Sequence, residues 1–247
     1  MRARGALHVH SNLSHDGTMT IAELAAWYRD RGYHFIAVGE HSQDMNEARV
    51  RELVDQSERA SSDDFRVIPG IEFACKGGLH ILGIGVTTLF SHFDPVVVTD
   101  AIHEHDGYAV VAHPTRKGTK IPPEVVHKAD AAEIWNVGYD GRFLPSSQSL
   151  ICFRNMRQLN PRLLAVAGHD FHRKGGFYDV AVEMDVGLLS AAAIVQNLRS
   201  GQYTIRARLF RCHADRDFTW FQSARLSFLS WQIGKLRGAR DLLWRRS

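Results

Sequence analysis

Residues 6–24 read ALHVHSNLSHDGTMTIAEL, and this stretch predicts a strand, a loop and a helix in that order. Ala6 to His10 is a short run typical of a buried strand, and a polar turn ending at Gly17 follows it. Thr20 and Glu23 have the spacing of a capping box, in which each side chain accepts a hydrogen bond from the backbone N–H of the other. A strand that carries two histidines therefore leads through a loop into a helix.

The same alternation continues along the chain. Further short apolar stretches predict strands at residues 35–39, 67–71, 79–84, 108–112, 131–135 and 163–167, and helical stretches lie at 45–59, 96–105 and 147–159. Alternating strands and helices indicate a parallel α/β architecture. Polar residues follow nearly every strand, which favours a (β/α) barrel over a doubly wound open sheet, where ligands gather at one switch point.

The composition excludes several classes of protein. The 247 residues are 45% hydrophobic and 23% charged, which rules out a disordered chain, collagen or a coiled coil. The net charge of +3 is too small to argue for nucleic acid as an obligatory partner. Cys75, Cys152 and Cys212 lack the spacing of a disulfide framework or a thiolate metal site, and no stretch is typical of a signal peptide or a membrane span. A soluble, cytoplasmic protein is expected.

Histidine is abundant, with 14 residues, and many of them follow predicted strands. His8 and His10 are two positions apart in a strand, so their side chains share a face and can bind one metal ion. Imidazole and carboxylate ligands together suit Zn²⁺, Mn²⁺ or Fe²⁺. The same predicted face of the barrel carries seven more candidate ligands: Asp16, His41, Glu72, His80, His113, Asp170 and His172. Because this set exceeds what one ion binds, we expect two or three divalent metal ions.

Several short motifs in this chain resemble those of the PHP (polymerase and histidinol phosphatase) superfamily. They are residues 8–17, Gly39-Glu40-His41, Gly70-Ile-Glu72, His80-Ile-Leu-Gly, Ala112-His113-Pro114 and Gly168-His-Asp170-Phe-His172. The resemblance spans about residues 6–185. It implies a distorted seven-stranded (β/α) TIM-like barrel that holds two or three divalent metal ions and hydrolyses phosphoesters.

The resemblance also implies how the ligands divide among the ions. It assigns His8, His10 and Asp170 to a first ion and makes Glu72 a bridge to the second. The remaining ligands are His80 and His113 for the second ion, and Asp16, His41 and His172 for the third.

Two positions depart from the family's pattern. Asp16 stands where some relatives have histidine, and an oxygen ligand would weaken the third site or favour Mn²⁺ over Zn²⁺. Glu40 stands where aspartate is usual, and we expect it to orient an imidazole. His15 and His169 are expected to lie beside the ligands without binding metal, with His15 as the alternative to Asp16.

The expected reaction uses a hydroxide activated by two metal ions, so it needs no protein nucleophile. Glu72 and Asp170 are the catalytic carboxylates, and Asp170 is also a candidate to take a proton from the water. Phosphate oxygens need cationic partners, and Arg116 and Lys117 directly follow the His113-Pro114 motif. Arg116 is expected both to bind substrate and to assist catalysis. Further substrate-binding candidates are Asn136, Arg142 and Arg173.

Phosphomonoesters of small metabolites or nucleotides are the expected substrates. Three alternatives stay open: a nuclease or phosphodiesterase acting on short oligonucleotides, a non-catalytic regulatory module that binds metal and phosphate, and hydrolysis of a C–N bond. An activity that prefers oligomers and falls with salt would favour the nuclease. The complete ligand set disfavours a module that has lost catalysis.

Two regions are expected: a phosphoesterase barrel at residues 1–204 and a basic extension at 205–247. The extension has ten Lys or Arg residues against three Asp or Glu, a net charge of +7, with aromatic residues interleaved. We expect an amphipathic helix that packs its apolar face on the barrel. Contact with a membrane surface, a polyanionic substrate or a partner is the alternative, and the sequence leaves the oligomeric state open.

Overall fold

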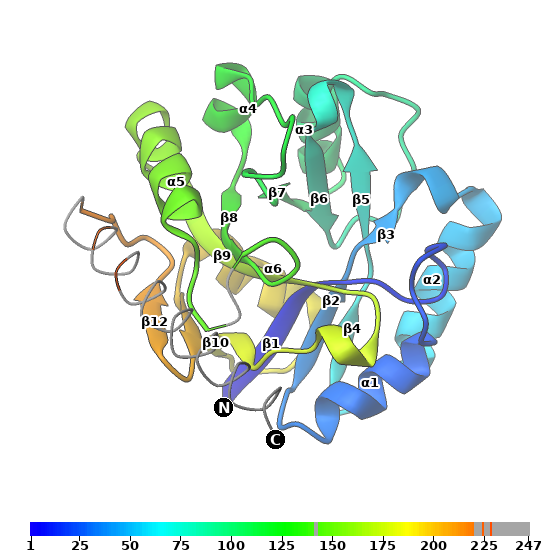
Figure 1. The fold of residues 1–247 in the computed structure, drawn as a ribbon. Helices are drawn as coiled ribbons and strands as arrows, with labels where there is room; N and C mark the ends of the chain where they lie inside the picture. Colours follow the sequence, from blue (N-terminus) through cyan, green and yellow to red (C-terminus); the bar gives the residue numbers. More distant parts are fainter. Residues whose placement is uncertain (141–142, 220–223, 225–227, 229–247) are drawn as a thin grey trace, which may run out of the picture.

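A computed structural model of the protein describes residues 1–140, 143–219, 224 and 228 (Figure 1). Within these residues, one twelve-stranded sheet is accompanied by six α-helices. The strands are β1 (Arg2–Val9), β2 (Phe35–Val38), β3 (Glu40–His41), β4 (Arg66–Ile68), β5 (Gly70–Ala74), β6 (His80–Ile84), β7 (Tyr108–Ala112), β8 (Ala131–Asn136), β9 (Leu164–Phe171), β10 (Val180–Asp185), β11 (Tyr203–Ala207) and β12 (Phe210–His213). The helices are α1 (Ile21–Arg29), α2 (Glu47–Ala60), α3 (Pro95–Glu104), α4 (Pro123–Lys128), α5 (Ser147–Leu159) and α6 (Ala191–Ser200).

The sheet extends from β1 in two directions. β1 pairs in parallel with β9, and β9 continues in parallel through β8 to β7. On its other edge β1 pairs with β2 and β2 with β4, while β3 pairs with β5. Gly39 separates β2 from β3, and a Cβ there would meet the end of the Leu82 side chain at 2.5 Å, so a larger residue would require that side chain to shift. The predicted α/β fold with a large sheet is confirmed.

Among the strands expected from the sequence, β6 runs against the predicted parallel arrangement. β6 pairs antiparallel with both β5 and β7, so the sheet is mixed and the all-parallel expectation was wrong here. The connection from Ala74 to His80 is too short for a crossover helix, and a short connection joins antiparallel strands. The reversal places His80 at the start of β6, opposite Ala74 at the end of β5 and Ala112 at the end of β7. His80 therefore reaches the sheet edge at which the parallel strands end.

The helices pack their apolar faces around the sheet. At the start of α1, the Thr20 side chain accepts from the Glu23 N–H and the Glu23 side chain from the Thr20 N–H, so the predicted capping box is confirmed. The buried face of α1 carries Ile21, Leu24 and Tyr28. All residues of β2, β7 and β8 are buried, as strands covered on both faces require.

Residues 203–213 form a β-hairpin, although residues 205–247 were expected to be helical. β11 and β12 extend the sheet antiparallel beyond β10. In β12 the buried Phe210 and Cys212 alternate with the exposed Arg211 and His213, which is the two-residue period of a strand. The boundary expected between residues 204 and 205 thus falls inside β11. The rest of the expected helix lies largely outside the described residues.

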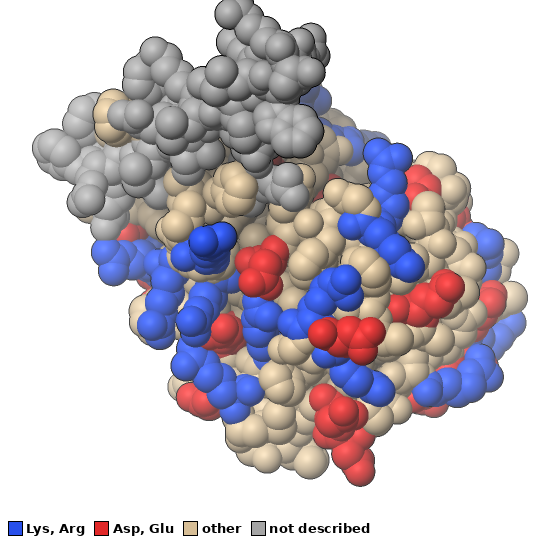
Figure 2. All heavy atoms as spheres, turned by 60° about the horizontal axis from the view of Figure 1, so that its bottom comes forward, with Lys and Arg blue, Asp and Glu red and all other residues tan. Residues whose placement is uncertain are grey.

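On the face that Figure 2 presents, Lys and Arg side chains are interspersed with Asp and Glu. This mixture agrees with the small net charge of +3. Among the helices in the described part of the chain, none has the length and apolar character needed to cross a membrane.

Candidate metal centre

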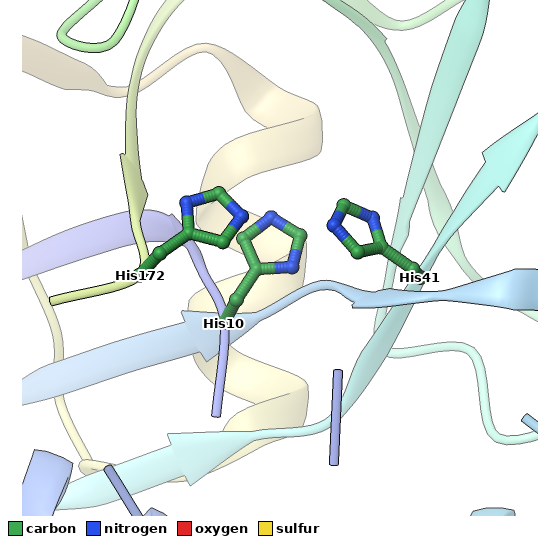
Figure 3. A group of neighbouring side chains, drawn as sticks. All are labelled: His10, His41 and His172. Atoms are coloured by element: carbon green, nitrogen blue, oxygen red, sulfur yellow. The ribbon is translucent and has the colours of Figure 1, made fainter. Parts of the chain in front are cut away.

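Three histidines from distant parts of the chain gather at one place, as Figure 3 shows. His10 directly follows β1, His41 ends β3 and His172 directly follows β9. The ring centroid of His10 lies 4.3 Å from that of His41 and 4.2 Å from that of His172. Each ring offers a nitrogen within 4.8 Å of the other two, so all three can contact one metal ion.

The Glu72 carboxylate is the centre of the wider cluster. Its side chain is 1% exposed and lies on β5, and residue 72 directly follows the predicted strand 67–71. Oε1 lies 2.8 Å from Nδ1 of His80, 2.8 Å from Nε2 of His113 and 3.4 Å from Nε2 of His8, while Oε2 lies 2.8 Å from Nδ1 of His41 and 3.8 Å from Nε2 of His10. One carboxylate therefore lies within 4 Å of five imidazoles from four segments of the chain, which suits a ligand shared between two ions.

A first ligand group contains His8, His10, Glu72 and Asp170. Oδ1 of Asp170 lies 3.7 Å from Nε2 of His8 and 3.5 Å from Nε2 of His10. Both histidines are fully buried, and neither Nε2 atom has a hydrogen-bond partner. Glu72, His80 and His113 form a second group, in which Nδ1 of His113 is also buried without a partner. The structure thus brings together the residues expected at the first two ions.

The residues expected at the third ion also meet. Oδ1 of Asp16 lies 3.3 Å from Nε2 of His41, and Oδ2 lies 3.2 Å from Nε2 of His172. His15 also has a ring nitrogen near Asp16 and His41. Nδ1 of His15, however, hydrogen-bonds to Oδ2 of Asp44 at 2.8 Å, and the ring is 63% exposed. Asp16 contacts two of the histidines expected at the third ion, whereas His15 is held by Asp44, so these contacts favour Asp16 over His15.

The backbone is left-handed at three of the expected ligands. Four described non-glycine residues have positive φ, and three of these are His8 (61°), His113 (28°) and Asp170 (47°). Each costs conformational free energy that the surrounding structure must offset, and such residues cluster at functional sites. The pairing of β1 shifts register between Ala6 and Val9. His8 and His10 are therefore brought together by an irregular stretch of β1. The sequence had predicted that they share one face of a regular strand.

Glu133 is a buried carboxylate that the sequence interpretation missed. Its Oε1 lies 2.7 Å from Nδ1 of His8, and Oε2 accepts the backbone N–H of His113 at 2.6 Å. Metal-binding histidines are commonly oriented in this way by a carboxylate. A lone acid inside the apolar run 131–135 was the available signal, because a buried carboxylate needs partners. Asn136 donates to Oε2 of Glu133 at 2.7 Å and is 2% exposed, so its amide lies among the residues that support the expected ligands.

Glu40 acts on the loop after β1. Its Oε1 accepts the Ser11 N–H at 2.9 Å and its Oε2 accepts the Ser14 hydroxyl at 2.5 Å. Ser14 in turn accepts the His41 N–H at 3.0 Å and lies 3.5 Å from Nδ1 of His10. Glu40 was expected to orient an imidazole, and its contacts place it to act on His10 through Ser14.

His169 does not line the cluster. It is buried beneath the sheet edge and hydrogen-bonds to the Tyr28 hydroxyl and the Val180 carbonyl. Burial lowers its pKa to about 4, so the ring is neutral at physiological pH.

Burial and charge act in opposite directions on the pKa values of the cluster. Burial favours neutral His8, but the carboxylates of Glu133, Glu72 and Asp170 outweigh it and raise the pKa of His8 well above its usual value. Burial would raise the pKa of Glu72, yet the adjacent imidazoles, with His8 the strongest, hold it well below the usual range. Burial lowers the pKa of His10 to about 4, so this imidazole is neutral and free to bind a metal ion.

These groups fit divalent metal ions. Four buried imidazole nitrogens have no hydrogen-bond partner, namely Nε2 of His8, His10 and His172 and Nδ1 of His113. A buried nitrogen without a partner costs free energy, and a metal ion would supply the missing contact. The donors are imidazoles and carboxylates, the ligands that Zn²⁺, Mn²⁺ and Fe²⁺ accept.

The expected cationic residues lie on two loops. Arg116 and Lys117 follow His113 directly, and the Arg116 Nη2 donates to the Gly78 carbonyl at 3.1 Å. Arg173 is exposed and follows His172. Arg142 lies outside the described residues.

No protein-family model and no curated protein matches the chain. Several solved structures do resemble it. A two-domain protein of Bacteroides vulgatus, containing a predicted PHP-like metal-dependent phosphoesterase, is 16% identical with a TM-score of 0.60 over 83% of this chain. PsfC of Pseudomonas syringae is 15% identical with a TM-score of 0.60, and the match covers 93% of this chain and 96% of PsfC.

A lesion-specific endonuclease of Pyrococcus furiosus, PfuEndoQ, is 17% identical with a TM-score of 0.59 over 92% of this chain. The chain spans 65% of the length of the Bacteroides protein and 66% of that of PfuEndoQ. At these identities the likeness concerns the fold. The chain therefore shares the fold of PHP-like metal-dependent phosphoesterases.

Proposed function

We propose that this protein is a metal-dependent hydrolase of the PHP type that cleaves phosphoesters, with phosphomonoesters of small metabolites or nucleotides as substrates. The observation that carries the proposal is the contact of Glu72 with five imidazoles, beside four buried ring nitrogens without partners. Buried polar groups without partners are destabilising, and bound metal ions would supply the missing contacts.

The ligand groups support two or three ions. His8, His10 and Asp170 would hold one, His80 and His113 a second, and Asp16, His41 and His172 a third, with Glu72 shared. Mn²⁺, Zn²⁺ and Fe²⁺ all suit these ligands, and the oxygen ligand Asp16 favours Mn²⁺ at the third position. The ions would polarise the phosphoester and lower the pKa of a water molecule.

The residues of the chain prepare the site for this chemistry. Glu133 accepts a hydrogen bond from Nδ1 of His8, which leaves Nε2 for the metal. Asp170 is held ionised and is the proposed acceptor of a proton from the attacking water. Arg116 is proposed to bind phosphate oxygens, because its loop directly follows His113.

We also propose that the sheet closes into the expected seven-stranded barrel. Gly39 alone separates β2 from β3, and Pro69 alone separates β4 from β5. If each pair is taken as one strand, the pairings run from β1 through β2/β3, β4/β5, β6, β7, β8 and β9 back to β1.

The free thiols of Cys75, Cys152 and Cys212 support a reducing, cytoplasmic location.

A second candidate is phosphodiester cleavage in an oligonucleotide. The resemblance to PfuEndoQ favours it, because that protein is a lesion-specific endonuclease. The two candidates differ in salt dependence: binding of an oligonucleotide weakens steeply as salt rises, whereas binding of a small monoester changes little.

Elemental analysis of the purified protein, followed by a substrate panel with the same ion, tests the proposal. We expect two to three equivalents of Mn, Fe or Zn per chain and hydrolysis of para-nitrophenyl phosphate or another monoester. A panel that also contains oligonucleotides and amides separates the candidate reactions. Absence of bound metal after anaerobic purification and reconstitution would refute the proposal.

A further inference from the structure

A cavity of about 410 Å³ begins at Pro114, the residue that follows His113 of the candidate metal centre. One wall is the loop 114–119, and the other is a face of α5 that carries Gln148, Ile151, Cys152 and Asn155. These four α5 residues occupy positions i, i+3, i+4 and i+7, so they project from one side of the helix. The cavity has the volume of a small-molecule binding site.

The cavity wall is continuous with the second ligand group. Pro114 is bonded to His113, and the Arg116 N–H donates to the His113 carbonyl at 2.9 Å. The Arg116 guanidinium reaches across to the Gly78 carbonyl, two residues before His80. Arg116 therefore spans the two loops that carry His80 and His113, with the cavity on one side of it.

The charge of this cavity differs from that of two others in the described part of the chain. Its lining contains the cations Arg116 and Lys117 and no acid. A cavity of about 490 Å³ pairs Asp106 with Arg199, and one of about 350 Å³ pairs Asp179 with Arg208. The cavity next to His113 alone among these three has a positive lining.

Its polar side chains are available to a ligand. Within the described residues, Lys117, Gln148 and Asn155 make no hydrogen bond or ion pair. The Arg116 guanidinium donates one hydrogen bond through Nη2, and its other N–H groups can donate to a ligand. Ile151 adds apolar surface between the two amides.

We propose that this cavity binds the organic part of the substrate and selects phosphomonoesters that carry a second anionic group, a phosphate or a carboxylate. The inference rests on the proposed function and adds the substrate class. Lys117 pairs with the second anion, Arg116 keeps its proposed role at the phosphate, and the Gln148 and Asn155 amides hydrogen-bond the polar groups between the two ends.

A matched series of substrates tests the proposal: propyl phosphate, phosphonooxypropanoate and propanediol bisphosphate. We expect kcat/KM to be about tenfold higher for at least one compound with a second anion than for propyl phosphate. The carboxylate and bisphosphate arms show which anion is preferred. Lys117→Gln should abolish this preference, whereas Lys120→Gln, which removes the same charge from an exposed residue outside the cavity lining, should keep it.

Equal kcat/KM for the three substrates, or equal losses of preference in both variants, would overturn the inference. Failure of the proposed function gives a different result, namely no hydrolysis of any phosphoester including para-nitrophenyl phosphate. In that case calorimetric titration with propanediol bisphosphate decides. Binding that is about tenfold weaker in Lys117→Gln than in Lys120→Gln supports the cavity as an anion site, and absence of binding or equal binding refutes it.

Discussion

The two carboxylate oxygens of Glu133 contact different ligand-bearing segments, Nδ1 of His8 and the backbone N–H of His113. Glu133→Gln keeps the size of the side chain but removes the charge that orients the imidazole. We expect metal affinity to fall about 10–100-fold, as for other carboxylates that orient metal-binding histidines. Titration with Mn²⁺ or Zn²⁺ against a competing chelator measures the change.

Glu183→Gln is the matched control. Glu183 is also a largely buried acid on a strand, but it pairs with Arg2 and Arg206. This variant should keep the wild-type metal affinity. Equal losses in both variants would show that Glu133 acts on overall stability.

His10 and Asp170 test the ligand assignment directly. His10→Ala and Asp170→Ala each remove a donor from the first group, so we expect at least a hundredfold loss of turnover and a lower metal content. The far-ultraviolet circular dichroism should stay that of the folded protein. His127→Ala, at an exposed position of α4, should retain activity. Unchanged turnover in either ligand variant would contradict the assignment.

The gathering of the expected ligands was predictable because they follow successive strands, and the ends of parallel strands meet at one edge. The contacts of Glu133 and Asn136 were not predictable, because both depend on which side chains meet across β8, β1 and β7. The strained φ values at His8 and Asp170 were also invisible, since they follow from the register shifts of β1 against its neighbours.

At the scale of elements, His103 links α3 to the start of β8. Its Nε2 lies 2.9 Å from Oδ2 of Asp130, which also accepts the Ala109 N–H at 2.7 Å. The hydrogen bond with Asp130 raises the pKa of His103 above its usual value of about 6.5. Protonated His103 therefore stabilises the fold fully below that value, and the stabilisation is lost as the pH rises through the folded-state pKa.

Urea unfolding across this pH range measures the effect. The free energy of unfolding of wild type should fall relative to that of His103→Gln as the pH rises above about 6.5. A constant difference between the two proteins would mean that the ring does not titrate against Asp130.

The positions of the strands followed from the apolar runs in the sequence. The direction of β6 and the β11–β12 hairpin did not follow from them. The direction of β6 depends on the short connection at Cys75–Leu79, which apolarity does not report. The β11–β12 hairpin was expected to belong to a helix because the charge and aromatic content of residues 205–247 were considered as one block. The alternation around Phe210 and Cys212 was a local strand pattern within that block.

At the scale of the whole molecule, metal binding at the buried cluster should be coupled to folding. The folded chain holds Glu72, Asp170 and Glu133 among imidazoles, and the unfolded chain does not preserve this site. An ion at a hundred times its dissociation constant should add about 2.7 kcal/mol to the free energy of unfolding. For a chain of this length that amounts to an increase of roughly 5–10 °C in Tm.

Thermal unfolding with EDTA and with added Mn²⁺ or Zn²⁺ measures this increase. In His10→Ala the increase in Tm on adding metal should be much smaller. This variant lacks Nε2 of His10, one of the buried nitrogens without a hydrogen-bond partner. His127→Ala should show the full increase. Identical Tm values with and without metal in the wild type would mean that the cluster is stable as a hydrogen-bonded network of imidazoles and carboxylates, and the ligand assignment would then be wrong.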